Sequence, residues 1–204
     1  MTGQAFAQPP AAALAKPVKV VAFGDSLTAG LGLMGNEAFP VRLQKALESK
    51  GIKVDMTNAG VSGDTASGGR DRLDWSIPEG TDAVILELGA NDALRGTDPA
   101  VTRAALADIL TRLKARKIAV LLCGMMAPPN YGTDYADRFN AIYPELAKKF
   151  DVPFYPFFLE GVAAEARFNQ KDGIHPTAEG VDAIVKNMLP TVEAFLGTVA
   201  GQRS

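Results

Sequence analysis

The sequence predicts an α/β fold in which helices cover both faces of a mostly parallel sheet of five strands, giving three layers. Short apolar runs rich in β-branched residues alternate along the chain with longer amphipathic runs. Glycine and proline mark the boundaries between these runs. A chain of 204 residues, 47% of them hydrophobic, favours one domain. We expect a flexible N-terminal tail over 1–17 and a single domain over 18–204.

The expected strands are compact apolar runs that end at a glycine or a turn, at 18–23, 52–60, 82–89, 118–124 and 152–157. The expected helices carry apolar residues at helical spacing, at 39–51, 64–77, 98–117, 135–150 and 177–196. Asp98 predicts the cap of the third helix and Pro99 its first turn, because a carboxylate accepts hydrogen bonds from free amides there and proline has no amide to satisfy. Pro190 predicts a kink in the last helix.

Composition excludes several classes of function. The net charge of −2 gives no basis for a nucleic-acid surface. We interpret the one basic cluster as a solvated helix end, formed by Arg112, Lys114, Arg116 and Lys117. No apolar run is long enough to span a membrane. A single cysteine excludes an intrachain disulfide, and a single histidine beside it excludes the usual zinc sites. We expect no metal or other cofactor, although an all-carboxylate site for a hard cation stays open.

The first 17 residues are rich in alanine, proline and glutamine. They lack the basic start and the full apolar core of an intact signal peptide. We interpret them as a disordered tail, within which "AFAQ" at 5–8 is the candidate remnant of a cleavage site.

Polar and glycine-rich segments follow the expected strands. In parallel sheets ligands bind at the carboxyl ends of the strands, so these segments should meet at one edge. Together they contain a nucleophile, a base, a carboxylate and hydrogen-bond donors, which are the groups that acyl hydrolysis needs. The segments are 24–26, 58–64, 89–92 and 124–132 after strands, and 172–176 before the last helix.

Each of these groups has a candidate. Ser26 is the candidate nucleophile, and His175 is the only histidine that can take its proton. Asp172, three residues earlier, can hold the histidine ring in orientation. The side chain of Asn91, the backbone amide of Gly60 and the amide of Ser26 are the candidate oxyanion donors.

Several alternatives compete with this interpretation. Taken singly, each motif is an ordinary helix cap or turn. The spacing Gly30-x-Gly32-x-x-Gly35 outlines a dinucleotide fingerprint, but the strand ends six residues too early for it. Cys123 could pair with the histidine as a nucleophile, although a lone cysteine at that position is typical of a core. A carboxylate-pair glycosidase would leave the histidine and the asparagine without a task.

Four motifs together resemble the GDSL or SGNH hydrolases and occur in the order of that family: "GDSL" at 24–27, "NAGVSGDT" at 58–65, "GAND" at 89–92 and "DGIHP" at 172–176. The longer segments "LELGANDALRG", "APPNYG" and "AIYPELAKKFDVPFYPFFLEGV" are similar to the bacterial branch of thioesterase I, lysophospholipase L1 and arylesterase. The resemblance covers about 18–196 and implies a flavodoxin-like sheet. By matching position it implies a triad of Ser26, Asp172 and His175, with the Ser26 and Gly60 amides and Asn91 as the oxyanion hole.

The resemblance also implies the substrates, which are carboxylic esters and thioesters cleaved through an acyl-serine intermediate. We expect Asp25, Leu94, Met125, Pro128 and Tyr131 to contact them. A carbohydrate acetylesterase, or a lipid or carbohydrate binder without catalysis on the same fold, is the alternative. The branch implies a periplasmic or secreted protein, whereas a complete chain without a leader would be cytoplasmic. No nucleic acid is expected as a partner, and an oligomer is left open.

Overall fold

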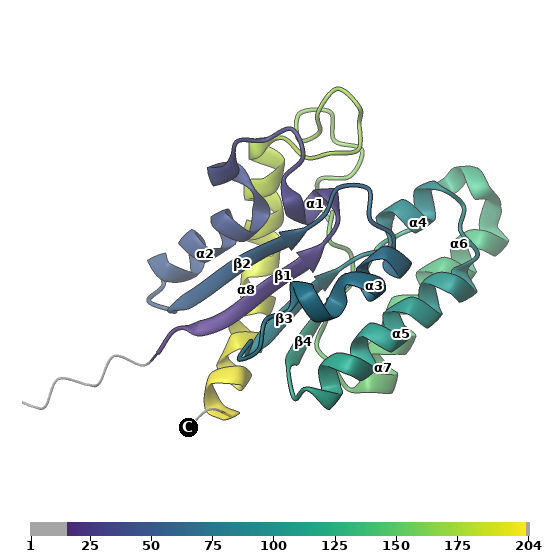
Figure 1. The fold of residues 1–204 in the computed structure, drawn as a ribbon. Helices are drawn as coiled ribbons and strands as arrows, with labels where there is room; N and C mark the ends of the chain where they lie inside the picture. The colour runs from purple at the N-terminus through teal and green to yellow at the C-terminus, as the bar shows by residue number, and fades with distance from the viewer. Residues whose placement is uncertain (1–15, 203–204) are drawn as a thin grey trace, which may run out of the picture.

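The computed structural model describes residues 16–202 and shows a parallel sheet between two layers of helices (Figure 1). The five strands are β1 (Val18–Gly24), β2 (Val54–Gly60), β3 (Ala83–Glu87), β4 (Ala119–Cys123) and β5 (Phe154–Tyr155). Their order is β2-β1-β3-β4-β5, and each neighbouring pair is parallel. This is the doubly wound order of flavodoxin-like folds, so the predicted fold class is confirmed.

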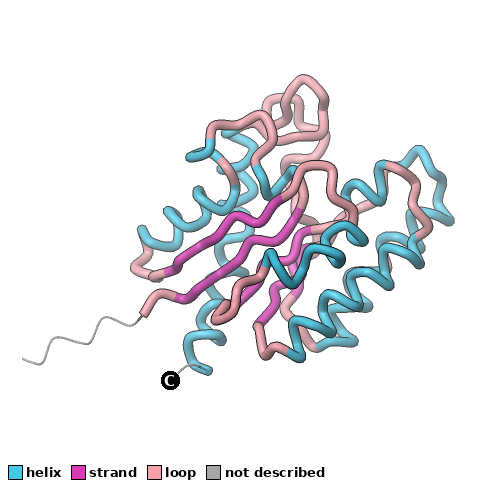
Figure 2. The backbone as a smooth tube through the Cα atoms, viewed as in Figure 1, coloured by secondary structure: helices cyan, strands magenta, loops and turns pink. Residues whose placement is uncertain are grey.

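Helices follow each of the first four strands and the last strand, as the alternating pattern predicts. They are α1 (Ser26–Ala29), α2 (Phe39–Ser49), α3 (Ala66–Ser76), α4 (Ala90–Leu94), α5 (Pro99–Ala115), α6 (Gly132–Asn140), α7 (Ile142–Phe150) and α8 (Ala178–Gln202), with short 3₁₀ turns at η1 (Gly35–Glu37) and η2 (Pro129–Tyr131). Helices α2 and α8 pack against each other on one face of the sheet, while α3, α5 and α7 cover the other (Figure 2). With both faces covered, β1 and β3 are buried almost throughout.

Two elements differ from the prediction because of proline. The helix expected over 135–150 is two helices, α6 and α7. Pro144 has no N–H for the carbonyl of Asn140, and its ring crowds that carbonyl, so the first helix ends there. The strand expected over 152–157 keeps only two residues, since Pro153 and Pro156 on either side cannot donate to a sheet.

The predicted start of the helix over 98–117 is confirmed. Asp98 caps α5, its side chain accepting the amide of Ala100 at 3.0 Å, and Pro99 opens that helix. Pro190 lies inside α8, where the kink stays a prediction, and the helix continues to Gln202, beyond the expected end at 196. The candidate cleavage remnant at 5–8 lies outside the described residues.

The basic cluster at the end of α5 is not simply solvated. Arg112 donates to the carbonyl of Arg70 at 2.9 Å and pairs with Asp74 at 2.6 Å. Arg116 donates to the carbonyl of Ile77 at 2.6 Å. These arginines therefore fasten α5 to α3 and the turn that follows it. Over residues 16–202, no helix combines the length and the apolar character that crossing a membrane requires.

Candidate active site

The chain turns sharply after β1 and presents Ser26 as the first residue of α1. This helix has a single turn, so its amides need acceptors from outside it. The carboxylate of Asp25 supplies one by accepting the amide of Leu27 at 2.9 Å. Gly24 has no room for a side chain, because a Cβ there would meet Thr28 and Glu87. The serine is thus held at the carboxyl end of a central strand.

Three side chains that are far apart in the sequence form a continuous hydrogen-bonded chain. Nε2 of His175 lies 2.9 Å from Oγ of Ser26. Nδ1 of the same ring lies 2.6 Å from Oδ2 of Asp172. Oδ1 of Asp172 accepts the backbone amides of Ile174 at 2.9 Å and His175 at 3.0 Å, which fixes the carboxylate in the turn.

The carboxylate of Asp172 stays ionised over a wide pH range. The hydrogen bond from the His175 side chain, followed by the amides of Ile174 and His175, lowers its pKa from 3.8 to about 2. An ionised Asp172 favours the tautomer with its proton on Nδ1, which leaves Nε2 free to accept the proton of Ser26. The contacts therefore suit proton transfer from serine to histidine.

The three candidate oxyanion donors lie at neighbouring strand ends, and two of them already have acceptors. The amide of Gly60 donates to Oδ1 of Asn58 at 3.0 Å. Nδ2 of Asn91 donates to the carbonyl of Asp64 at 2.9 Å and to Oδ2 of Asp25 at 3.2 Å. An oxyanion would compete with these bonds, most easily with the longer bond to Asp25.

Gly60 is required for a reason that differs from the prediction. The sequence suggests that a missing Cβ lets the substrate approach. In the structure a Cβ at this position would meet the backbone of α1 at Ala29 and at the carbonyl of Asp25. The glycine therefore lets β2 pack directly against the helix that carries Ser26.

The predicted substrate wall is partly wrong. The Asp25 side chain has no exposed surface, and Met125 is 3% exposed within the core, so neither presents a surface to a substrate. Leu94 and Tyr131 are exposed, and the hydroxyl of Tyr131 donates to the carbonyl of Leu94 at 2.8 Å, which joins the loops after β3 and β4. Pro128 is half-buried.

Glu87 belongs to this region, although the motifs do not point to it. Its side chain is fully buried, and Oε2 accepts the hydroxyl of Thr28 at 2.7 Å and the amide of Asp25 at 3.3 Å. Burial and the nearby Asp25 carboxylate raise the pKa of Glu87 well above its usual value, and burial raises that of Asp25 to about 6. The available signal was a glutamate inside the apolar run 83–88.

The alternative sites do not fit this geometry. Gly30 ends α1 in the left-handed conformation, Gly35 opens only a 3₁₀ turn, and the next long helix begins at Phe39, so the glycines open no α-helix against a phosphate. Cys123 is fully buried and burial raises the pKa of its thiol, while the histidine ring faces Ser26.

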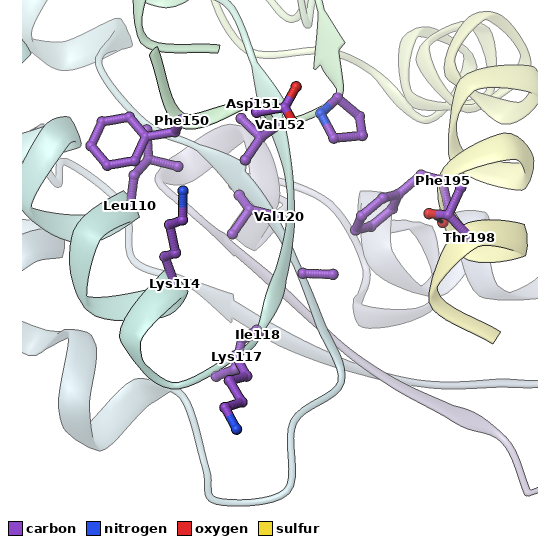
Figure 3. Close-up of a pocket in the computed structure, with 12 residues that line it drawn as sticks. Leu110, Lys114, Lys117, Ile118, Val120, Phe150, Asp151, Val152, Phe195 and Thr198 are labelled. Atoms are coloured by element: carbon purple, nitrogen blue, oxygen red, sulfur yellow. Dashed lines mark hydrogen bonds between the residues drawn. The ribbon is translucent and has the colours of Figure 1, made fainter. Parts of the chain in front are cut away.

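A cavity of about 500 Å³ lies away from the serine, at the edge of the sheet where the parallel strands begin. Figure 3 shows the residues that line it. The cavity lies beside the first residues of β4, and Lys114, Phe150 and Phe195 contribute to its lining. Since Ser26 follows the carboxyl end of β1, this cavity is no part of the candidate active site.

Comparisons with known proteins show the family of the chain. The sequence profile of the GDSL-like lipase/acylhydrolase family matches residues 22–183. The chain belongs to this family. The predicted membership is confirmed, and with it the predicted class of ester hydrolase.

Individual members are similar over most of the chain. Esterase TesA of Pseudomonas aeruginosa is 39% identical over 174 residues, which are 85% of this chain and 87% of that protein. Thioesterase 1/protease 1/lysophospholipase L1 of Escherichia coli is 40% identical, covering 83% and 82%. The crystal structure of AlinE4, an SGNH-hydrolase family esterase, is 45% identical with a TM-score of 0.76, covering 89% of this chain and 98% of that one.

Proposed function

We propose that the protein hydrolyses carboxylic esters and thioesters through an acyl intermediate on Ser26. The observation that carries the proposal is the continuous hydrogen-bonded chain from Oγ of Ser26 through the ring of His175 to the carboxylate of Asp172. A serine hydroxyl becomes a nucleophile when a base takes its proton, and this chain supplies both the base and the group that orients it.

The proposed reaction has two halves. Nε2 of His175 takes the Oγ proton while Oγ of Ser26 bonds to the carbonyl carbon, and the carbonyl electrons move to its oxygen. When the carbonyl re-forms, the bond to the leaving group breaks and His175 returns the proton to the departing alkoxide, phenolate or thiolate. Water then replaces the serine in the same steps and releases the acid.

The negative oxygen needs donors that are already in place. Ser26 opens α1, so its amide is one of the helix N-terminal donors without an intrahelical acceptor. The amide of Gly60 and Nδ2 of Asn91 lie at the ends of the neighbouring strands and complete the set. We assign these three groups to the oxyanion hole.

The surroundings favour acyl groups with apolar carbon chains. Leu94, Met126 and Tyr131 are exposed in the loops that follow β3 and β4, on the edge of the sheet where Ser26 lies. The matched relatives are named esterase, arylesterase, thioesterase and lysophospholipase, which all cleave acyl bonds. A periplasmic or secreted location and any oligomeric state stay predictions, which cell fractionation and sedimentation velocity would test.

A panel of p-nitrophenyl esters and acyl-CoA thioesters of increasing chain length tests the proposal. We expect turnover by the wild-type chain and none above background by Ser26→Ala. A carbohydrate acetylesterase would instead prefer acetylated sugars over every member of the panel. A binder without catalysis would turn over neither kind of substrate.

A further inference from the structure

Arg72 is a buried arginine whose side chain serves no step of the reaction described above. It projects from α3, is 8% exposed, and its guanidinium lies 4.2 Å from the ring centre of Phe23 in β1. Such a buried charge needs its hydrogen bonds satisfied. The hydrogen-bond acceptors around Arg72 show which segments of the chain it holds together.

The guanidinium donates to two backbone carbonyls and to one carboxylate, on three separate segments of the chain. Nη2 donates to the carbonyl of Gly24 at 2.8 Å, and Nη1 donates to the carbonyl of Ala59 at 2.9 Å. Nε pairs with Oδ2 of Asp64 at 2.6 Å. One further bond, from Nη1 to Ser76 at 3.1 Å, stays within α3.

Each of these three segments carries or holds one candidate oxyanion donor. Gly24 lies two residues before the amide of Ser26, and Ala59 directly precedes the amide of Gly60. The carbonyl of Asp64 accepts Nδ2 of Asn91 at 2.9 Å and so orients that side chain. One planar group therefore contacts all three of the segments that carry or hold these donors.

We propose that Arg72 is a positioning residue for the oxyanion hole, holding the ends of β1 and β2 and the loop at Asp64 at the separation that the transition state requires. The inference rests on the proposed function. Arginine suits this task because its donors diverge in a fixed plane, whereas lysine offers a single point charge on a flexible stem. Catalysis is sensitive to this spacing, since a displacement of about 1 Å can cost about 10²-fold in rate.

The test compares Arg72→Lys and Arg72→Met with the wild-type chain. Arg72→Lys keeps a positive charge beside Asp64, so it is the variant that should fold if Arg72→Met does not. Arg116→Lys is the matched control, because Arg116 also donates to backbone carbonyls, but to those of Ile77 and Pro78, directly after α3. For each variant, kcat is calculated per active site. The concentration of active sites is the amount of protein that a fluorophosphonate has labelled when the labelling reaction is complete.

We expect Arg72→Lys to lower kcat by about 10- to 100-fold with little change in KM, because displaced donors weaken the transition state more than the bound ester. Butylboronic acid forms a tetrahedral adduct on a reactive serine and places an oxygen among the same donors. Its inhibition constant should rise by about the factor by which kcat/KM falls. Arg116→Lys should change neither quantity.

Two results would overturn the proposal. One is a wild-type kcat per labelled site in Arg72→Lys, whatever its melting temperature, because Arg72 would then only stabilise the fold. The other is a lower kcat with unchanged inhibition by butylboronic acid. Failure of the proposed function is recognised separately, by hydrolysis that persists in Ser26→Ala.

Discussion

The hydrogen bonds of the fully buried Glu87 carboxyl predict how substitutions at this position change the stability of the fold. Its Oε2 accepts two buried donors, the hydroxyl of Thr28 at 2.7 Å and the amide of Asp25 at 3.3 Å. Its Oε1 has no hydrogen-bond partner among the residues that the structure describes. Burial, together with the nearby Asp25 carboxylate, raises the pKa of Glu87 well above the usual 4.5 and so favours the neutral acid in the folded protein.

Two substitutions separate the role of the acceptor from the role of the charge. Glu87→Gln keeps an oxygen for both donors and puts its amide nitrogen where Oε1 lies. Its free energy of unfolding at pH 7 should lie close to that of the wild type and above that of Glu87→Leu. Glu87→Leu leaves both donors without an acceptor, at a cost of about 1–3 kcal/mol each, or about 2–6 kcal/mol in total. Adding Thr28→Val removes one of these donors and should recover about 1–3 kcal/mol.

The pH dependence of stability has a definite sign. Above pH 4.5 the folded protein retains the Glu87 proton that the unfolded chain releases, so this residue makes stability fall as the pH rises. Urea unfolding followed by far-UV circular dichroism at pH 5 and pH 8 measures the effect, and Glu87→Gln should show a smaller difference between the two. If Glu87→Gln were as unstable as Glu87→Leu at pH 7, the folded protein would need the charged carboxylate and the reasoning would be refuted.

Three further predictions concern the active site directly. Asp172→Asn should lower kcat by about 10⁴-fold, because an amide stabilises the wrong histidine tautomer, and a variant with wild-type kcat would remove Asp172 from the mechanism. The pKa of Asp172 in the wild type is about 2, so any activity that a stopped assay shows to be lost between pH 7 and pH 5 should come from another group. Asn91→Ala should lower kcat by about 10²–10³-fold, with a modest fall in melting temperature because Asp25 and the carbonyl of Asp64 each lose a donor. An unchanged rate would show that its amide does not contact the oxyanion. Gly60→Ala should lower both the melting temperature and kcat, because its methyl group meets the backbone of α1, whereas Gly35→Ala, with open space around it, is the control and should match the wild type. A Gly60→Ala variant with wild-type stability would contradict the packing described here.

Much of the fold is visible in the sequence because local signals and packing agree. A parallel sheet buries both faces of its strands, so β1, β3 and β4 appear as short continuous apolar runs. The motifs after these strands meet because parallel strands all end at the same edge. The contact between Ser26 and His175, which are 149 residues apart, follows from that topology and not from spacing along the chain.

What the sequence does not show depends on burial and on side-chain direction. Asp25 and Met125 come shortly after strands, as the exposed residues Leu94 and Tyr131 do, but their side chains are buried in the core. Arg72 lies in a helix made weak by glycines, and its hydrogen-bond partners lie at the ends of β1 and β2 and in the loop at Asp64. No local pattern predicts that convergence. Among these residues, Glu87 could have been noticed in the sequence, because it is an ionisable residue within an apolar strand.

The most direct test of the central claim is to find which atom carries the acyl group. The intact protein is treated with ethyl fluorophosphonate, digested, and analysed by mass spectrometry for the modified peptide. We predict a single adduct, on Ser26, that appears in parallel with the loss of ester hydrolysis and is absent from Ser26→Ala. Stoichiometric modification of a different residue, with Ser26 unmodified and activity abolished, would contradict the account.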